Sequence, residues 1–340
     1  MRKNIFLLCF LSLMVLLVSC SASDSSGEVS TDEAEFVLRL PHIVSTDNPA
    51  HIAALDFQEE VEEESDGRIE VQIFPNGELY DSDRELIEAL QLNNIEISLV
   101  GAPSLGNFDE RFYVLDLPFL FEDREAPRQA LAGELGEELS NGLEDINLKV
   151  LGYGYDGFRH VLNSQHPIET LEDMNGLQLR VQESEIQEEM FNALGANASP
   201  LAYGELYSAL QQNVYDGMDS PLGLVDSGLF YEVQDYLSLT YHQYSGLIFL
   251  MSQERFNQLP EDLQDIVVTA AADMEDNYYD LVDEAEDTIR QEMEDDNLIE
   301  INEISKGERQ RLIEAVQPVY DQFAEIVGED LVDMAKNTDE

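Results

Sequence analysis

The chain has 340 residues, and its 72 Asp and Glu against 17 Lys and Arg give a formal net charge of −55 at pH 7. A chain of this length can fold as two domains that each bury a core. So large a negative charge excludes proteins that bind nucleic acid or an anionic lipid surface through their own charge. Self-repulsion on this scale opposes a compact state unless salt screens it, and the Debye length falls to about 3 Å near 1 M salt. We therefore expect an acidic, halophilic protein from a saline habitat.

Residues 1–19 predict a secretory signal peptide. Arg2 and Lys3 precede an apolar run from residue 5 to residue 18. The run is too short to span a bilayer comfortably and is typical of the apolar region of a signal peptide. Cys9 would leave with this peptide, so the exported protein would have no pair of thiols for a disulfide.

Residues 20–35 predict an attachment to a membrane. The sequence Leu-Val-Ser-Cys at 17–20 resembles a lipoprotein signal, with cleavage before Cys20 and acylation of that cysteine. The alternatives are an ordinary signal peptide and an uncleaved anchor. Several acyl chains would hold the protein stably at a membrane, and the Ser-, Asp- and Glu-rich residues that follow predict a disordered tether. We expect an extracytoplasmic protein, in the periplasm or at the outer face of the cytoplasmic membrane.

The globular part of the chain is expected to begin at residue 36, as a mixture of strands and helices. Alternating or apolar runs predict strands, and turn residues followed by helical periodicity predict helices. In chain order these are a strand at 36–40, a turn-rich loop at 41–51 that opens a helix to about 65, a strand at 68–74, a helix from Tyr80, a strand at 95–100 with a loop at 101–104, an apolar core segment at 114–121, a helix near 124–140 and a strand near 148–153.

The most informative segment is 176–221, which predicts a β-α-β-α unit. We expect a strand at 177–182, a helix to about 194, an extended stretch at 199–201, a helix at 203–212 and a turn at 216–217. Arg180 lies near the C-terminal end of the strand, the end at which open α/β sheets bind ligands. A solvated edge position is the ordinary alternative. In a chain with so few cations, a retained arginine is more informative than usual.

Several motifs resemble the solute receptors of tripartite ATP-independent periplasmic (TRAP) transporters, the DctP-like family. They are GLQLRV at 176–181, ALGA at 193–196, YGELYSALQ at 203–211, Asp-Gly at 216–217 and FYEVQDYLSLTYH at 230–242. The resemblance spans about 36–327. It implies an α/β, two-lobed, periplasmic-binding-protein-like (Venus flytrap) fold, closure on a small organic-acid ligand such as a C4-dicarboxylate or a sugar acid, no cofactor, and delivery to a TRAP permease of a small and a large membrane subunit driven by an ion gradient.

The same resemblance divides the chain between two lobes. Residues 36–156 with about 244–285 are expected to form lobe 1, and residues 157–243 with about 286–328 lobe 2. An apolar strand at 244–251 returns to lobe 1. Proline then marks a helix start at 260, and helical periodicity continues to about 296. A helix that long in a two-lobed protein is expected to bridge both lobes; a strand at 298–301 and an amphipathic helix at 307–327 follow.

Two arginines are expected to bind the ligand. By the family match, Arg180 pairs bidentately with a carboxylate, in an interaction that is geometrically specific. Arg159 lies in DGFRHVLNS at 156–164, which resembles the family's NGFRHxTNS, where an arginine lines the cleft. Arg159 precedes Arg180 by 21 residues, and we expect it on an adjacent strand, so that both guanidinium groups converge on one carboxylate.

Other ligand contacts are expected on the loops around the cleft. His42 and His51 lie in a loop that resembles the family's first ligand loop, although each is as well explained as a packed or solvated residue. Asp83 or Arg84 is expected to face the cleft, with helix capping the alternative for the acid.

Three further positions follow the two arginines along the chain. Gln182 and Glu183 either meet hydroxyl groups of the ligand or cap the next helix. Ser220 stands where the family has an asparagine that binds the ligand, so that contact is lost, bridged by water or assigned to a different ligand. Small residues near Gly101 replace an acid of the sialic-acid branch, which argues against a sialic-acid ligand.

Motifs for other chemistries are absent from the exported part of the sequence. It has no C-x-x-C, H-E-x-x-H, G-x-S-x-G or G-x-x-x-x-G-K-[ST], so we expect neither a bound metal nor an enzyme. Two alternatives remain at this stage. One is a receptor that presents its ligand to a sensor kinase, and the other is a secreted hydrolase.

Overall fold

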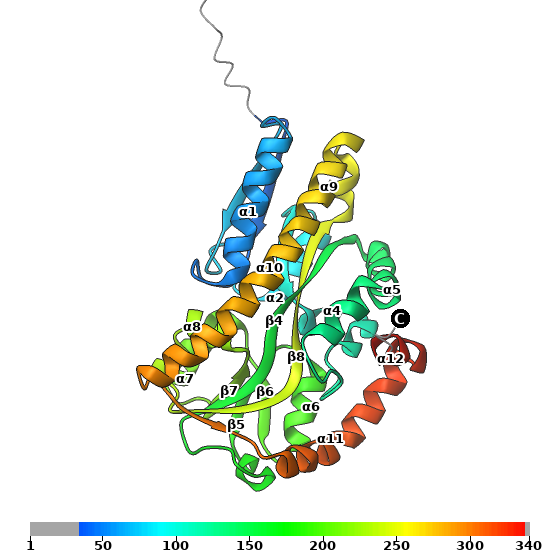
Figure 1. Cartoon of the computed structure of the whole chain (residues 1–340). Coiled ribbons are helices and arrows are strands. Elements are labelled where there is room, and N and C mark those ends of the chain that lie inside the picture. The colour runs from blue at the N-terminus through cyan, green and yellow to red at the C-terminus, as the bar shows by residue number, and fades with distance from the viewer. Residues whose placement is uncertain (1–33, 337–340) are drawn as a thin grey trace, which may run out of the picture. The chain divides into compact units, whose positions relative to one another are not determined.

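The structure, a computed structural model, describes residues 34–336, so the predicted signal peptide, Cys20 and most of the tether lie outside the described residues. These residues form a mixed α/β fold with two sheets (Figure 1). No helix in this part of the chain combines the length and the apolar character that crossing a bilayer requires.

The smaller sheet consists of β1 (Phe36–Pro41) and β2 (Ile69–Phe74), which are parallel. The connection between them is α1 (Pro49–Glu64), whose N-cap is Asn48 and which begins with a proline. The N–H groups of the first helical turn have no partner within the helix. Proline, which has no N–H, therefore loses no hydrogen bond at this position. These elements match the strands and the helix predicted at 36–40, to about 65 and at 68–74.

The larger sheet has the strand order β3-β8-β4-β7-β5-β6, with β9 paired to β8. Its strands are β3 (Ile97–Gly101), β4 (Leu148–Asn163), β5 (Gln178–Val181), β6 (Asn197–Pro200), β7 (Gly217–Ser220), β8 (Tyr236–Ser252) and β9 (Glu300–Glu303). The β-α-β-α prediction is confirmed by β5, α6 (Glu185–Ala193), β6 and α7 (Tyr203–Gln211).

Strands β4 and β8 are much longer than predicted, with 16 and 17 residues, and they pair antiparallel along most of their lengths. The sequence predicted strands at 148–153 and 244–251 and a separate strand around Arg159, which belongs to β4. Register shifts at Val150/Gly152, Tyr155/Gly157 and Arg159/Val161 interrupt the regular pairing. Since a bulge breaks the two-residue alternation that identifies a strand, the pattern stops being readable before the strand ends.

Strand β7 was predicted only as the end of a turn. It carries Asp219 and Ser220, and all four of its residues are buried. A short run with two buried polar residues has no alternating pattern. Its place in the sheet depends on partners far along the chain, His160 to Asn163 of β4 and Leu179 and Arg180 of β5.

The helix boundaries follow local capping. Helix α2 (Asp83–Gln91) begins later than the predicted Tyr80, because Ser82 is its N-cap and accepts a hydrogen bond from the backbone N–H of Glu85. Gly133 divides the helix predicted near 124–140 into two. The remaining helices are α3 (Ala102–Leu105), α4 (Glu125–Ala132), α5 (Glu134–Leu143), α8 (Leu222–Ser227), α9 (Gln253–Gln258), α10 (Glu261–Asp295), α11 (Lys306–Val327) and α12 (Glu329–Lys336).

Three groups of buried apolar side chains make up the interior of residues 34–336. The first core includes Leu38, Phe57, Val100, Phe249 and Met274; the second includes Leu179, Met190, Phe191, Leu312 and Val316; the third includes Leu162, Met218, Phe230, Leu237 and Met293. Strands β4 and β8 supply residues to the first and third cores, so they are continuous between them.

Helix α10 has 35 residues and also joins two cores, as predicted for the bridging helix. Met274 and Val282 belong to the first core, whereas Ile289 and Met293 belong to the third. Figure 1 shows the helix running from α9, beside α1, toward α7 and α8.

Helix α11 is shared in the same way. Its first half contributes Leu312 and Val316 to the second core, and its second half contributes Phe323 and Val327 to the first. The helix was predicted to belong to lobe 2 alone. Contacts of its second half with the first core give the chain another crossing between the cores.

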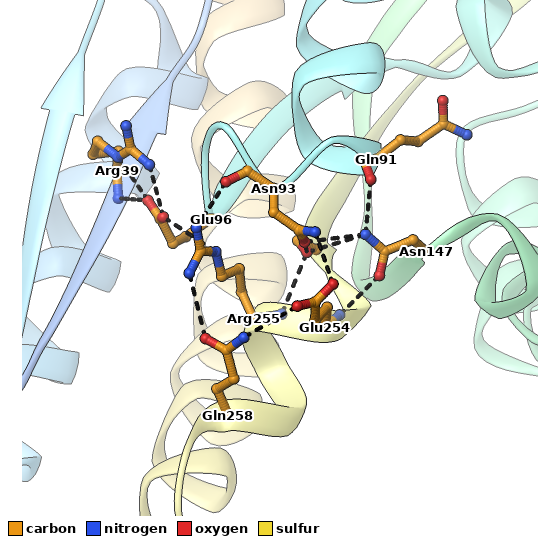
Figure 2. Close-up of polar contacts among 9 residues, drawn as sticks. Arg39, Gln91, Asn93, Glu96, Asn147, Glu254, Arg255 and Gln258 are labelled. Atoms are coloured by element: carbon orange, nitrogen blue, oxygen red, sulfur yellow. Dashed lines mark hydrogen bonds and ion pairs between the residues drawn. The ribbon is translucent and has the colours of Figure 1, made fainter.

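A polar cluster fixes the small sheet to the start of the large one (Figure 2). Glu96, just before β3, accepts hydrogen bonds from Nε and Nη2 of Arg39 on β1 at 2.9 and 2.8 Å. Arg255 of α9 donates to the backbone carbonyl of Asn93 at 2.9 Å, and Asn147 donates to that of Gln91 at 2.9 Å. The two sheets are therefore joined by side chains rather than by a continuous ladder of strands.

Candidate ligand-binding cavity

A cavity lies where the loop after β1, the start of α2, the end of β3, the end of β5 and the start of α7 come together. About 640 Å³ is free of protein atoms, including the part open to solvent at its mouth. Its wall combines apolar side chains with a few polar ones. Five predicted site residues line it: His42, Asp83, Arg180, Gln182 and Glu183.

Arg180 is the central residue of this cavity. It is 4 % exposed, and its Nε donates to the backbone carbonyl of Leu201 at 2.8 Å. No carboxylate of the described residues forms an ion pair with it, and its two terminal nitrogens have no hydrogen-bond partner there. Burial, followed by the like charge of Arg159, lowers the pKa of Arg180 to about 10, so the guanidinium still carries its charge at pH 7.

His42 adds a polar but uncharged group. Its Nε2 lies 3.0 Å from Nδ1 of His51. Burial, followed by the proximity of His51, lowers the pKa of His42 to about 4, and burial also lowers the pKa of His51. His51 is behind His42 and does not line the cavity. Arg180 is therefore the only cation on the cavity wall at neutral pH, within the residues that the structure describes.

Asp83 faces the same cavity from the first turn of α2. Burial raises the pKa of Asp83 to about 7, although a hydrogen bond from the backbone of Gly101 opposes the rise. An added Cβ at Gly101 would lie 2.9 Å from Oδ2 of Asp83 and 3.2 Å from Nε2 of Gln182. Because Gly101 has no Cβ, the carboxyl of Asp83 and the side-chain amide of Gln182 can both lie close to the backbone at the end of β3.

Gln182 is oriented by its neighbour in α6. Its Oε1 accepts from Nε2 of Gln187 at 3.2 Å, and its backbone N–H donates to Oε1 of Gln187 at 3.1 Å. The amide nitrogen of Gln182 is consequently directed to the cavity side. Glu183 lines the cavity and also a neighbouring surface hollow, where Arg84 lies.

Asp156 and Tyr203 line the cavity and were missed by the sequence reasoning. Loss of solvation raises the pKa of Asp156 to about 6, and a hydrogen bond from the hydroxyl of Tyr278 opposes the rise. Asp156 could have been identified from the sequence, because this chain has an aspartate where the motif NGFRH has an asparagine. Tyr203 begins α7, and only the fold turns it toward β5.

Arg159 does not line the cavity. It is 1 % exposed on β4, where its Nε lies 2.5 Å from Oδ2 of Asp219 and its Nη2 donates to the Asp219 carbonyl at 2.8 Å. Burial alone would raise the pKa of Asp219, but Arg159 and His242 hold it well below its usual range. The prediction that Arg159 and Arg180 lie on adjacent strands is wrong, because β7 separates β4 from β5.

Two other predicted residues also lie off the cavity wall. Arg84 is exposed and pairs with Glu88 one turn along α2, at 3.0 Å. Ser220 is 2 % exposed at the end of β7. The register of the sheet pairs Ser220 with His160 of β4, and the side chain of Ser220 is buried at that position.

Hydrogen bonds also join segments that are distant in the sequence and adjacent to residues of the cavity wall. Asn48 at the start of α1 donates to the hydroxyl of Ser227 in α8 at 3.1 Å. The backbone N–H of Gly204 in α7 donates to the carbonyl of Asp81 at 3.2 Å. These bonds join elements of the first core to elements of the third.

The model of the family described as "Bacterial extracellular solute-binding protein, family 7", DctP, matches residues 40–326. The chain belongs to this family.

Among curated relatives, this DctP-family chain is 31 % identical over 298 residues to the C4-dicarboxylate-binding protein DctB of Bacillus subtilis, covering 88 % of this chain and 85 % of the relative. Among solved structures, it is similar to the sugar acid binding protein DctPAm of Advenella mimigardefordensis in complex with galactonate, with a TM-score of 0.86, 32 % identity, and coverage of 89 % and 98 %. It is also similar to a TRAP periplasmic solute binding protein of Sulfurospirillum deleyianum with bound succinate, with a TM-score of 0.85 and 30 % identity. That match covers 90 % of this chain and 100 % of the other. The predicted TRAP-receptor family and two-lobed α/β fold with a long helix are confirmed.

Proposed function

We propose that this protein captures a small organic acid in the cavity around Arg180 and delivers it to a TRAP permease made of a small and a large membrane subunit. One observation carries the proposal. Arg180 is a buried cation with no carboxylate partner among the described residues, in a chain that has 17 cations against 72 acids. A desolvated, unpaired charge is costly, and a ligand carboxylate would compensate it.

The related structures support the ligand class. Galactonate and succinate are the ligands of the two similar proteins described above, and both are small carboxylates. A bidentate arginine–carboxylate pair supplies two charge-assisted hydrogen bonds, each worth roughly 1.5–3 kcal/mol net. The protein acts as a receptor and leaves its ligand chemically unchanged.

Closure of the lobes is part of the proposal. The cavity wall takes His42 and Asp83 from segments next to the first core and Arg180 and Tyr203 from segments next to the second and third. A ligand that contacts both sets binds the closed arrangement better than an open one, and therefore shifts the population toward it.

Calorimetric titration with a panel of organic acids tests this function. At least one acid should bind to the wild-type protein, and Arg180→Ala should weaken that binding by about 100-fold or more, equivalent to roughly 2.7 kcal/mol. Arg84→Ala removes an exposed arginine outside the cavity and serves as the matched control, with unchanged affinity. Equal affinity of Arg180→Ala and wild type would remove Arg180 from the site, and appearance of a reaction product would contradict a receptor.

We also propose that Cys20 anchors the protein to the membrane on its extracytoplasmic side. The signal-like residues 1–19 and the Leu-Val-Ser-Cys sequence support it. Mass spectrometry of the membrane-extracted protein should show an acylated N-terminal cysteine, and Cys20→Ser should release the protein to the soluble fraction. A wild-type protein that begins at another residue would contradict the anchor.

A further inference from the structure

The charges on the cavity wall restrict the ligand further than its family does. A dicarboxylate brings two negative charges, and each needs a cation or several donors to offset its lost solvation. Arg180 can compensate one of them. His42, the other basic side chain on the wall, is neutral at pH 7, since burial keeps its pKa near 4.

The other ionisable groups of the wall are three carboxyls and the hydroxyl of Tyr203, beside the neutral side chains of Ser82, Ser104 and Gln182. Asp83, Asp156 and Glu183 all line the cavity. Asp156 lies close enough to Asp83 to disfavour a negative charge there and so adds to the rise in the pKa of Asp83, which is mainly due to burial. Asp83 and Arg180 do not form an ion pair with each other, although they interact electrostatically. A ligand held by Arg180 therefore has this acidic side of the cavity within reach.

An aspartyl side chain in either protonation state can accept hydrogen bonds. Hydroxyl groups of a ligand can donate to either form, whereas a ligand carboxylate can only accept. A carboxylate adds a like charge beside the ionised form, so the discrimination is expected above the pKa of Asp83, which is about 7. Asp156 has part of its capacity occupied by the hydroxyl of Tyr278, and no side chain of the described residues donates to Asp83. Asp83, which accepts from the backbone N–H of Gly101 but from no side chain, thus has acceptor capacity left for a ligand hydroxyl.

We propose, on the basis of the function proposed above, that the cavity selects hydroxylated monocarboxylates over dicarboxylates and that Asp83 is the residue that determines this specificity. The single carboxylate of such a ligand lies at Arg180, and its hydroxyl groups donate to Asp83 and Asp156. A second carboxylate at the far end of the ligand would face Asp83 without a compensating cation.

Matched pairs of sugar acids test the proposal by calorimetry at fixed pH and salt. Galactonate and galactarate share a carbon chain and four hydroxyl groups and differ only in the terminal group, a primary alcohol or a second carboxylate. Gluconate and glucarate form a second pair of this kind. We expect at least one monocarboxylate to bind about 10-fold or more tightly than its dicarboxylate partner, and succinate to bind more weakly than both.

The Asp83→Asn variant tests whether Asp83 causes the preference for monocarboxylates. The variant keeps the size of the side chain and removes the carboxyl, so the preference for the monocarboxylate should shrink by about 5-fold or more, mainly through tighter dicarboxylate binding. Glu88→Gln removes an acid from the same helix outside the cavity and should leave the preference within about 2-fold, as expected for a screened surface charge.

The outcomes separate this inference from the function on which it rests. Succinate or an aldarate binding as tightly as the aldonates, with dependence on Arg180, would overturn the monocarboxylate preference and leave the organic-acid receptor intact. A zwitterion such as a betaine binding more tightly than any hydroxy acid would overturn the role of ligand hydroxyls. Binding of none of these compounds would instead contradict the proposed function. A preference that persists unchanged in Asp83→Asn would remove Asp83 as its cause.

Discussion

The two buried arginines should affect stability in opposite directions when each is replaced by methionine, which is similar in length and uncharged. Arg180 is buried without a carboxylate partner among the described residues. Its pKa falls from 12.5 to about 10. Below that pH both folded and unfolded chains carry the charge, so the folded state bears the full cost, roughly 3 kcal/mol at 1.36 kcal/mol per pKa unit.

Arg180→Met relieves this cost and loses the hydrogen bond to Leu201, which is worth about 1 kcal/mol. Without ligand, the variant should gain about 2 kcal/mol and melt about 4–8 °C higher. Arg159→Met has the opposite effect, since it leaves Asp219 buried and without its cation. Breaking a buried pair costs about 3–5 kcal/mol, so this variant should melt about 6–20 °C lower.

Calorimetric melting of protein that has been unfolded and refolded to remove any carried ligand measures both effects. Titration of the same samples with the best ligand completes the comparison, because Arg180→Met should lose binding despite its higher melting temperature. A melting temperature for Arg180→Met that falls as far as that of Arg159→Met would refute the reasoning, since it would show that Arg180 is a stabilising structural residue.

Three further predictions concern pH, Gly101 of the cavity wall and salt. Burial raises the pKa of Asp83 and of Asp116 to about 7 and that of Asp156 to about 6, so these carboxyls bind more protons in the folded than in the unfolded chain between about pH 4 and 7, and their contribution to stability falls as pH rises. His42 and His160, whose pKa values are lowered to about 4 and about 3, contribute in the opposite direction up to about pH 6.5. Asp116→Asn removes one of the carboxyls, so the melting temperature of the variant relative to the wild type should rise as pH rises through this window, and a constant difference would count against this origin. Gly101→Ala should weaken ligand binding by about 10-fold or more, because the added methyl displaces Asp83 and Gln182, while the fold is kept; Gly307→Ala, with only Ser305 Oγ near the added Cβ, at 3.9 Å, is the control, and equal binding by both variants would exclude a role for this contact. The melting temperature of the wild-type protein should rise between low salt and about 2 M NaCl, because screening relieves self-repulsion; a flat profile would contradict adaptation to salt.

Most of the fold can be predicted from the sequence alone. Local patterns identified β1, α1, β2 and the long helix α10, because each has its own periodicity and end signals. The motifs at 176–181 and 230–242 identified the family, and Arg180, predicted as a site residue at the end of a short strand, lines the cavity. Such features are encoded within a few residues of one another, so they can be read along the chain.

Only the tertiary structure distinguished the two arginines. Arg159 and Asp219 are 60 residues apart in the sequence. In the sheet, β7 lies between β4 and β5, so the Asp219 carboxylate on β7 is next to Arg159 on β4. The same assembly brings Asp83 of α2 and Asp156 of β4 to the segment that carries Arg180 and Gln182, so three separate segments meet there. Electrostatic pairing depends on distance in space and on burial, neither of which is written in the order of residues. The sequence therefore revealed that a scarce cation was retained, and the fold decided which one was left without a partner.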